Sequence, residues 1–259
     1  TLAFVLLVGF FILFAYLWVR PKTKSVSNNF QLVEEDAPAK EQVQEIVEEN
    51  GKYADILNDA AYMAEHNIYA KEALNKDCVT ITFAGDILFD PNYSVMATLL
   101  QNGGNLESSI APDLLAEMKS ADIMMINNEF PYSDRGMPIP EKQFTFRASP
   151  ASVSYLNDMG VDIVSLANNH AYDYGEEALL DTLQVLKDAG IPYVGAGINE
   201  KEASAPVYFI INNMKIAIIS ATQIERLDNP DTKEATESSP GVFRCWNGEK
   251  LLQKIQEAK

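Results

Sequence analysis

Short apolar runs alternate with amphipathic stretches along the chain after about residue 78. CVTITFAGD, residues 78–86, alternates apolar and polar side chains, and IMMI, 123–126, and VDIV, 161–164, are rich in apolar residues, as is typical of strands. Between and after them, residues 112–122 and 175–189 have the pattern of amphipathic helices. Strands that alternate with helices predict an α/β fold on a largely parallel sheet with helices on both faces.

Turn residues mark the remaining elements of this region. Ser149 and Pro150 predict the start of a helix that Gly160 ends, and Gly190 ends the helix before the short strand predicted in IPYVGAG. The segment VYFIINNMKIAIISAT, 207–222, predicts a hairpin around two asparagines that tolerate positive φ.

The first apolar run is of a different kind. Residues 2–19 carry no charge, and at 1.5 Å per residue they span about 27 Å, close to the bilayer core of about 30 Å. Tyr16 and Trp18 lie at one end, as in an interfacial aromatic belt. No small-residue cleavage site follows, so residues 1–20 are predicted to be an uncleaved single-pass anchor rather than a signal peptide.

The anchor is followed by a polar linker and a helical region. Residues 21–40 are rich in Pro, Ser and Asn, which predicts a linker. Residues 41–76 have apolar positions spaced by three and four with a break near Gly51, which predicts a helical stalk. His66 in this stalk is expected to be a surface or core residue rather than a metal ligand. Residues 77–259 are predicted to be the folded domain.

Charge limits the classes of partner. The net charge of −17 argues against non-specific nucleic-acid binding, because neutralising phosphates requires clustered Lys and Arg. An anionic partner would need help from metal ions, and the acidic run between residues 31 and 60 is typical of a solvated face or tether. Cys78 and Cys245 form no zinc motif; they are either paired, if the domain lies outside the cytoplasm, or idle thiols.

Polar side chains follow three successive predicted strands. Asp86 ends the first, Glu129 follows the second, and Asn169 and His170 follow the third. The carboxyl ends of parallel strands meet at one edge of a sheet, so these groups are expected to converge there. Oxygen ligands with an imidazole suit a divalent ion such as Mn²⁺, Fe²⁺ or Zn²⁺.

Each group also has a structural interpretation. Asp86 could cap a turn, and Glu129 could pair with Arg135 on a surface loop. Residues 168–170 could form a hydrogen-bonded turn that leads to the next helix.

The segments TFAGDILF, INNEF, FTFRASP and LANNHAYDYGEEALLDTLQVLKDAGIPYVGAG resemble the CapA capsule-synthesis proteins of bacterial poly-γ-glutamate production. That family is similar to calcineurin-like metallophosphoesterases, and the resemblance covers roughly residues 78–222. It implies a four-layer metallophosphoesterase-like α/β sandwich behind a transmembrane helix and stalk. It also implies a domain outside the cell, although the basic residues after the anchor, by the positive-inside rule, favour the inside.

The resemblance assigns roles to the polar groups. Asp86 resembles the first metal-binding aspartate and Glu129 the bridging carboxylate. Asn169 and His170 resemble the pair that supplies a metal ligand and a catalytic acid, so His170 is the predicted catalytic residue.

Two further residues are predicted to contact substrate. Arg147 in FTFRASP could hold an anionic group, or it could form a structural pair with a nearby carboxylate. Asn168 lies beside the predicted metal ligand and is assigned to substrate binding as well.

The chain departs from the metallophosphoesterase pattern. Leu88 occupies the position of a usual metal-binding His, and only His66 and His170 occur in the chain. Since the chain stops at Lys259 without a closing strand, it is predicted to be truncated within the family's domain. The hairpin at 207–222 would then have an uncovered edge or face exposing three isoleucines, Ile210, Ile216 and Ile218.

Two functions follow. The first is a membrane-anchored accessory protein in capsule or poly-γ-glutamate synthesis or export, whose expected partners are the lipid bilayer, other membrane subunits and the anionic polymer, with no nucleic acid. The second is a metal-dependent surface hydrolase with Mn, Fe, Zn or Mg, in which Asp86, Glu129 and Asn169 hold the ion and His170 protonates the leaving group.

Overall fold

The computed structural model describes residues 46, 50–223, 233–246 and 248–259, all within one compact unit formed by residues 41–259. The predicted anchor, residues 1–20, and the predicted linker, residues 21–40, lie outside the described residues. Within the described ranges, no helix has both the length and the apolar character needed to cross a membrane.

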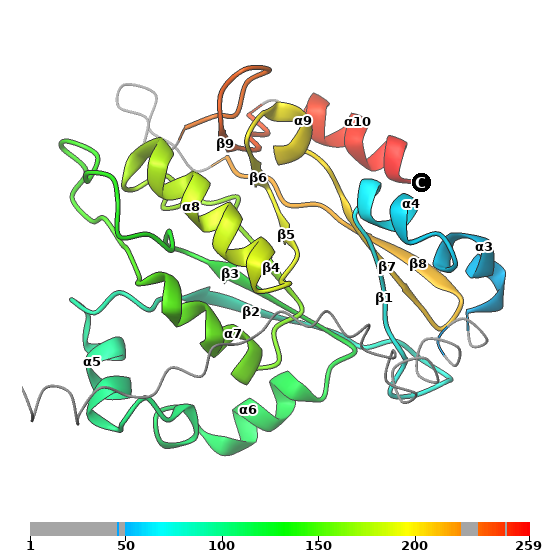
Figure 1. Ribbon diagram of the computed structural model, residues 1–259, viewed down its shortest axis with the longest axis horizontal. Coiled ribbons are helices and arrows are strands. Elements are labelled where there is room, and N and C mark those ends of the chain that lie inside the picture. The colour runs from blue at the N-terminus through cyan, green and yellow to red at the C-terminus, as the bar shows by residue number, and fades with distance from the viewer. Residues whose placement is uncertain (1–45, 47–49, 224–232, 247) are drawn as a thin grey trace, which may run out of the picture. The chain divides into compact units, whose positions relative to one another are not determined.

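Short helices and strands alternate along the described chain (Figure 1). The helices are η1 (Gly51–Tyr53), α3 (Ala54–Leu57), α4 (Ala60–Glu65), α5 (Ser94–Gln101), η2 (Leu106–Ser108), α6 (Pro112–Lys119), η3 (Pro150–Val153), α7 (Ser154–Asp158), α8 (Gly175–Asp188), α9 (Glu200–Ala203) and α10 (Glu249–Ala258). The strands are β1 (Ile68–Ala70), β2 (Ile81–Ile87), β3 (Ile123–Asn128), β4 (Ile163–Ser165), β5 (Tyr193–Val194), β6 (Ala196–Gly197), β7 (Val207–Ile211), β8 (Met214–Ile218) and β9 (Gly241–Val242).

A four-stranded parallel sheet in the order β2-β3-β4-β5 confirms the predicted α/β class. Its register places Asp86 of β2 opposite Asn127 of β3, and Asn127 opposite Ser165 of β4. The carboxyl ends of three neighbouring strands therefore form one edge, as the alternation of strands and helices predicted.

The two faces of this sheet are covered differently. Along β3, Met124 and Ile126 pack into a core with buried side chains of α5, α6, α7 and α8. Ile123 and Met125 point the other way and pack with Val207 and other residues of a second sheet. The prediction of helices on both faces was wrong, because a sheet rather than a helix layer covers the second face (Figure 1).

The second sheet has the order β1-β7-β8. β7 and β8 form the predicted hairpin, whose turn residues Asn212 and Asn213 have φ of 49° and 55°. The predicted exposure of its isoleucines was wrong for Ile210 and Ile218, which are 0% and 8% exposed. Ile218 is buried because it packs against the parallel sheet, and the half-buried Ile216 lies beside it.

The described part of the predicted stalk, residues 46 and 50–76, belongs to the same compact unit as the rest of the domain. β1 pairs in parallel with β7, so this segment supplies a strand of the second sheet rather than a separate helical stalk. Asn50 also accepts a hydrogen bond from the backbone N–H of Asn213, at 2.7 Å, which ties the segment to the hairpin turn. The two cysteines, Cys78 and Cys245, are free thiols.

The motif GAG, residues 195–197, brings two backbones close together. Gly195 has φ of 88° and separates β5 from β6, so the single strand predicted here is broken. A Cβ added at Gly195 would lie 2.5 Å from the Ala167 Cβ, and one at Gly197 would lie 2.5 Å from the Ala203 N. Only glycine allows this approach to the turn that follows β4.

We therefore predict that Gly195→Ala destabilises the domain more than Gly190→Ala. Both positions have positive φ, which costs alanine about 1–2 kcal/mol, but a Cβ at Gly190 meets nothing within 4 Å. The clash of the added Cβ at Gly195 should lower the free energy of unfolding by about a further 1–3 kcal/mol. Urea unfolding of both variants measures the difference, and equal losses would show that close approach is unimportant at Gly195.

Candidate functional site

The predicted polar groups converge at the carboxyl edge of the parallel sheet. The side chains of Asp86 and Glu129 are hydrogen-bonded to each other. The His170 Nε2 lies 3.8 Å from the Glu129 Oε1. Three of the residues predicted from successive strand ends are thus neighbours, as the parallel pairing requires.

An irregularity in β2 directs Asp86 into this cluster. The pairing with β3 shifts register between Phe83 and Asp86, and such a bulge changes the direction of the side chains beyond it. The Asn127 Nδ2 then donates a hydrogen bond to the Asp86 Oδ1 at 2.8 Å. Asp86 is therefore held from the neighbouring strand rather than by a simple turn.

Glu129 lies between Asp86 and His170 with a side chain that is 17% exposed. Burial first, and then the hydrogen bond and negative charge of Asp86, raise the pKa of Glu129 from 4.5 to about 8. The hydrogen bonds from Glu129 and Asn127 lower the pKa of Asp86, despite its partial burial. At neutral pH the pair therefore carries a proton on Glu129 and a charge on Asp86.

The alternative pairing of Glu129 with Arg135 is not what the structure shows. Arg135 instead forms ion pairs with Glu177, at 3.2 Å, and with Asp181, both on α8. The Glu129 side chain is directed into the carboxyl edge of the sheet, whereas the ion pairs of Arg135 with α8 lie on the surface.

Asn168 holds the turn that carries the predicted ligand and the catalytic residue. Its Nδ2 donates to the Asn127 Oδ1 and to the Asn128 carbonyl, both at 3.0 Å. Its Oδ1 accepts from the backbone N–H of His170 at 2.9 Å. The structure thus shows a buried amide that positions the turn, while substrate contact by Asn168 stays a prediction.

His170 is fixed on two sides. Its Nδ1 lies 2.8 Å from the Asp173 Oδ2, and the Phe146 ring stacks on the imidazole with the centroids 4.2 Å apart. The opposite nitrogen, Nε2, faces Glu129. The predicted Asn169 is half-buried beside it.

Two residues that contact the predicted site were missed in the sequence. Asp173 orients His170, and Lys142 forms an ion pair with Asp173 at 2.5 Å and donates to the Asn169 carbonyl. Asp173 belongs to the D-x-G that follows the NNH motif, which was a usable signal. Lys142 lies in the long connection between β3 and η3, where no sequence pattern distinguishes it from a surface lysine.

Arg147 lies over an aromatic ring near the same turn. Its guanidinium carbon is 4.3 Å from the centroid of Tyr174, and its backbone N–H donates to the Asp90 Oδ2 at 2.8 Å. Among the residues the structure describes, no carboxylate forms an ion pair with Arg147, so its predicted structural alternative is replaced by a cation–π contact.

The donors of this edge suit a single hard cation better than two metals. Across the described part of the chain, no three His, Cys, Asp or Glu side chains are close enough together to hold a metal ion. Asp86 and Glu129 supply two adjacent carboxylates, and amide oxygens of Asn are nearby. Carboxylates, amides and water are typical ligands of Mg²⁺ or Mn²⁺.

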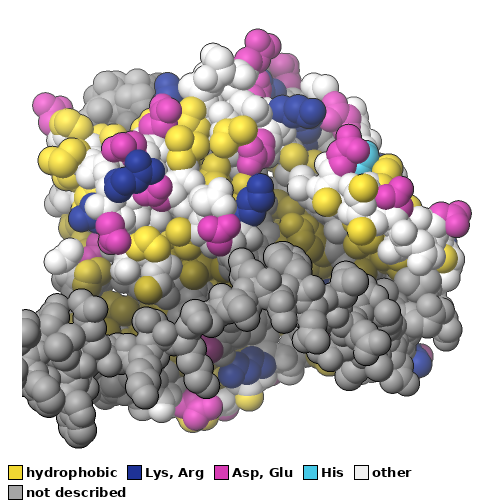
Figure 2. All heavy atoms as spheres, in the orientation of Figure 1, with side chains coloured by type: hydrophobic (Ala, Val, Ile, Leu, Met, Phe, Trp, Pro, Cys, Tyr) yellow, Lys and Arg dark blue, Asp and Glu magenta, His cyan; other side chains and the backbone are white. Residues whose placement is uncertain are grey.

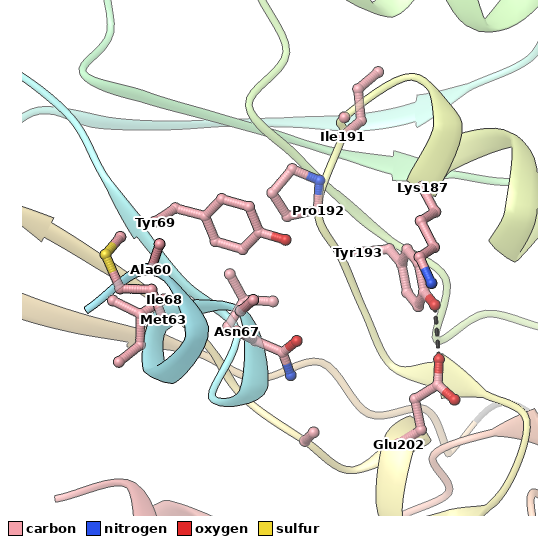
Figure 3. A pocket seen from close by; sticks show the side chains of 14 residues that line it. Ala60, Met63, Asn67, Ile68, Tyr69, Lys187, Ile191, Pro192, Tyr193 and Glu202 are labelled. Atoms are coloured by element: carbon pink, nitrogen blue, oxygen red, sulfur yellow. Dashed lines mark hydrogen bonds between the residues drawn. The ribbon is translucent and has the colours of Figure 1, made fainter. Parts of the chain in front are cut away.

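A separate cavity of about 610 Å³ lies away from this edge. It is lined by residues of α4, β1, the start of β5 and the segment around α9, and its wall includes the rings of Tyr69 and Tyr193 (Figure 3). The Tyr193 hydroxyl donates to the Glu202 Oε1 at 2.7 Å. None of the predicted site residues lines the cavity.

The molecular surface is mixed in charge on the face that Figure 2 shows. On the face in Figure 2, Asp and Glu side chains are interspersed with Lys and Arg and with apolar side chains. The chain as a whole has a net charge of −17, so an anionic ligand must be recognised locally rather than by a general field.

Comparison with known proteins gives one family and several relatives. Residues 80–259 match the family described as "Bacterial capsule synthesis protein PGA_cap". The chain is 30% identical over 145 residues to "Capsule biosynthesis protein CapA" of Bacillus anthracis, which covers 55% of this chain and 34% of that protein. It is 26% identical over 185 residues to "PGA biosynthesis protein CapA" of Bacillus subtilis, which covers 71% of this chain and 46% of that protein.

A third relative comes from Mycobacterium tuberculosis. It is described as a "Probable polyglutamine synthesis accessory protein" and is 29% identical over 127 residues, which covers 49% of this chain and 33% of the relative. The matched regions thus span between a third and a half of the length of these relatives.

The raised pKa of Glu129 predicts how stability depends on pH. In metal-free buffer the folded state retains a proton on Glu129 that the unfolded state has lost, between about pH 4.5 and about pH 8. The contribution of the Glu129 proton to the free energy of unfolding is therefore fully present below this window. It is lost as pH rises, and the free energy of unfolding falls by at most about 1.4 kcal/mol per pH unit.

Glu129→Gln should remove this slope, and Glu107→Gln, at an exposed position, should leave it unchanged. Urea unfolding in EDTA between about pH 4.5 and about pH 8 measures how the free energy of unfolding depends on pH. A wild-type slope that persists in Glu129→Gln would contradict the assignment of the proton.

Proposed function

The chain belongs to the bacterial capsule synthesis protein family, and from this membership we propose that it is an accessory protein in the synthesis or export of capsule polymer, with poly-γ-glutamate as the expected polymer. The observation that carries the proposal is the family match over residues 80–259. The printed descriptions of the relatives from B. anthracis, B. subtilis and M. tuberculosis support it.

We infer that the described domain is part of a metallophosphoesterase-like sandwich. Two features support this inference: a parallel sheet packed against a second sheet, and polar residues gathered at the carboxyl ends of β2, β3 and β4. Fold alone does not define a reaction.

A membrane location is part of the proposal. The apolar run of residues 2–19 would be a single-pass anchor in the bilayer, with the domain outside the cell and other membrane subunits of a polymer-synthesis complex as its partners. The family membership supports the outside location, whereas the basic residues after the run favour the opposite one.

Contact with an anionic polymer requires local positive charge. Arg147 is half-buried over Tyr174, and its side chain has no carboxylate partner among the described residues, so it is a suitable group for a polymer carboxylate. A divalent ion at Asp86 and Glu129 would serve the same purpose, because it would neutralise the negative charge of Asp86 that otherwise repels the polymer.

A second function is favoured by the contacts of His170. In this alternative the protein is a metal-dependent hydrolase in which Asp86, Glu129 and Asn169 hold one ion of Mn, Fe, Zn or Mg. Such an ion would supply Lewis acidity and lower the pKa of bound water. Asp173 would orient His170, whose Nε2 could transfer a proton at the edge where Glu129 lies.

The two functions differ in what the loss of His170 does to polymer formation. In the organism that encodes the full-length protein, we predict that deleting the gene abolishes surface polymer. His170→Ala should lower polymer only a few-fold, because an accessory role needs no proton transfer. Removal of a general acid or base in an essential enzyme usually costs about 10²–10⁴-fold, so a loss as complete as the deletion would favour the hydrolase.

The matched control is His66→Ala, which changes the other histidine of this chain at an exposed position. Immunoblotting must show equal protein in all strains. Polymer is measured as acid-released glutamate from washed cells.

Protease accessibility tests the proposed orientation. Because the domain is proposed to lie outside, protease added to intact cells freed of capsule should remove everything after the anchor. Survival of the domain until the membrane is opened would show that the positive-inside pattern of Arg20, Lys22 and Lys24 is decisive instead.

A further inference from the structure

The cavity of about 610 Å³ lies between edge strands of the two sheets. β5 is an outer strand of the parallel sheet, and β1 is an outer strand of the second sheet. Tyr193 of β5 and Tyr69 of β1 both line the cavity. Small-molecule sites usually have volumes of about 300–1,000 Å³, so this cavity is large enough to hold a ligand.

Most of the cavity wall is apolar. The apolar side chains come from α4, β1, the residues before β5, and β7, and they include Met63, Ile68, Ile191, Pro192 and Val207. In Figure 3, Met63 and Ile68 lie on the side of α4, and Ile191 and Pro192 lie on the side of β5. An apolar ligand body would fill this space favourably, because apolar surface is stabilised when it leaves water.

One carboxylate at the cavity already has its donors. The Tyr193 hydroxyl donates to the Glu202 Oε1 at 2.7 Å, and the Ile198 N–H donates to the Oε2 at 3.2 Å. Burial first, and then the hydrogen bond and charge of Glu202, raise the pKa of Tyr193, so its phenol keeps its proton at neutral pH. Both oxygens of Glu202 are therefore paired without a cationic ligand.

Two further donors line the cavity, the Tyr69 hydroxyl and the Lys187 Nζ. Neither group has a hydrogen-bond or ion-pair partner among the residues that the structure describes. Partial burial raises the pKa of Tyr69, so this phenol also keeps its proton. In Figure 3 the Tyr69 hydroxyl is directed toward the side of the cavity on which Tyr193 lies.

These donors select the charge of the ligand. A phenol and an ammonium group match an anionic acceptor such as a carboxylate. The nearby Glu202 carboxylate disfavours a doubly charged group such as a phosphate monoester, because like charges repel. A single negative charge therefore suits this mixture of groups best.

We propose that the cavity binds a small monocarboxylic acid with an apolar body. The Tyr69 hydroxyl and the Lys187 Nζ bind the carboxylate, and the apolar wall packs against the body. None of the residues at the carboxyl edge of the parallel sheet lines this cavity, so the inference is independent of the proposed function.

Calorimetric titration with biphenylacetate tests the proposal. The 259-residue chain is placed in lipid nanodiscs, since detergent would compete for an apolar cavity, and the heat of empty nanodiscs is subtracted. EDTA removes metal ions that could bind the probe elsewhere. We expect one saturable site, with biphenylethanol at least about threefold weaker than the acid and biphenylethylamine weaker still.

Variants of the lining residues locate the probe. Lys187→Met should weaken the acid at least about threefold and affect the alcohol less, and Tyr69→Phe, which keeps the ring, should weaken the acid about 2–10-fold. Lys76→Met, at an exposed position that does not line the cavity, is the matched control. Ala64→Trp, from an exposed position of α4 that lines the cavity, should fill it and abolish binding of both acid and alcohol.

Thermal unfolding confirms that each variant is folded. Wild-type affinity in a folded Ala64→Trp, or no saturable binding by the wild type, would overturn the proposed site. Equal affinity for the three probes, or a preference for the amine, would overturn the assignment of a carboxylate. Arg147→Met is measured as well, because a loss of binding there but not in Lys187→Met would place the probe at the carboxyl edge instead.

Discussion

The parallel register of β2, β3 and β4 is the constraint on which the site depends. It sets Asp86 opposite Asn127 and Asn127 opposite Ser165, so that the residues after each strand meet at one edge. A slip of one residue would turn Asn127 to the other face and remove its hydrogen bonds with Asp86 and Asn168. Burial of β3 on both faces makes such a slip costly.

Charge balance is the second property of this edge. Two carboxylates lie in contact, and they coexist because Glu129 retains a proton when no cation is bound. The buried Asp173 is instead balanced by Lys142. The proposed ion would replace the proton of Glu129, which is why the same pair of residues is important in the accessory and the hydrolase alternatives.

The second sheet explains why the segment before residue 77 belongs to the domain. Ile68 of β1 is 4% exposed, and β1 lies along β7, whose Phe209 packs on the parallel sheet. Apolar residues spaced by three and four are common to free-standing stalks and to helices that pack on a domain. The spacing in residues 41–76 therefore could not distinguish these arrangements, and the strand pairing does.

The sequence by itself determined the class of fold and the three strands that carry the site. Alternating and continuous apolar runs predicted β2, β3 and β4, and Gly190 predicted the end of α8, because these signals are local. Parallel strands also implied that Asp86, Glu129 and His170 would meet. The tertiary structure alone decided that a second sheet covers one face, that Asn168 holds the turn, and that Lys142 reaches Asp173. These outcomes depend on contacts between residues far apart in the chain, and no spacing pattern encodes a contact of that kind.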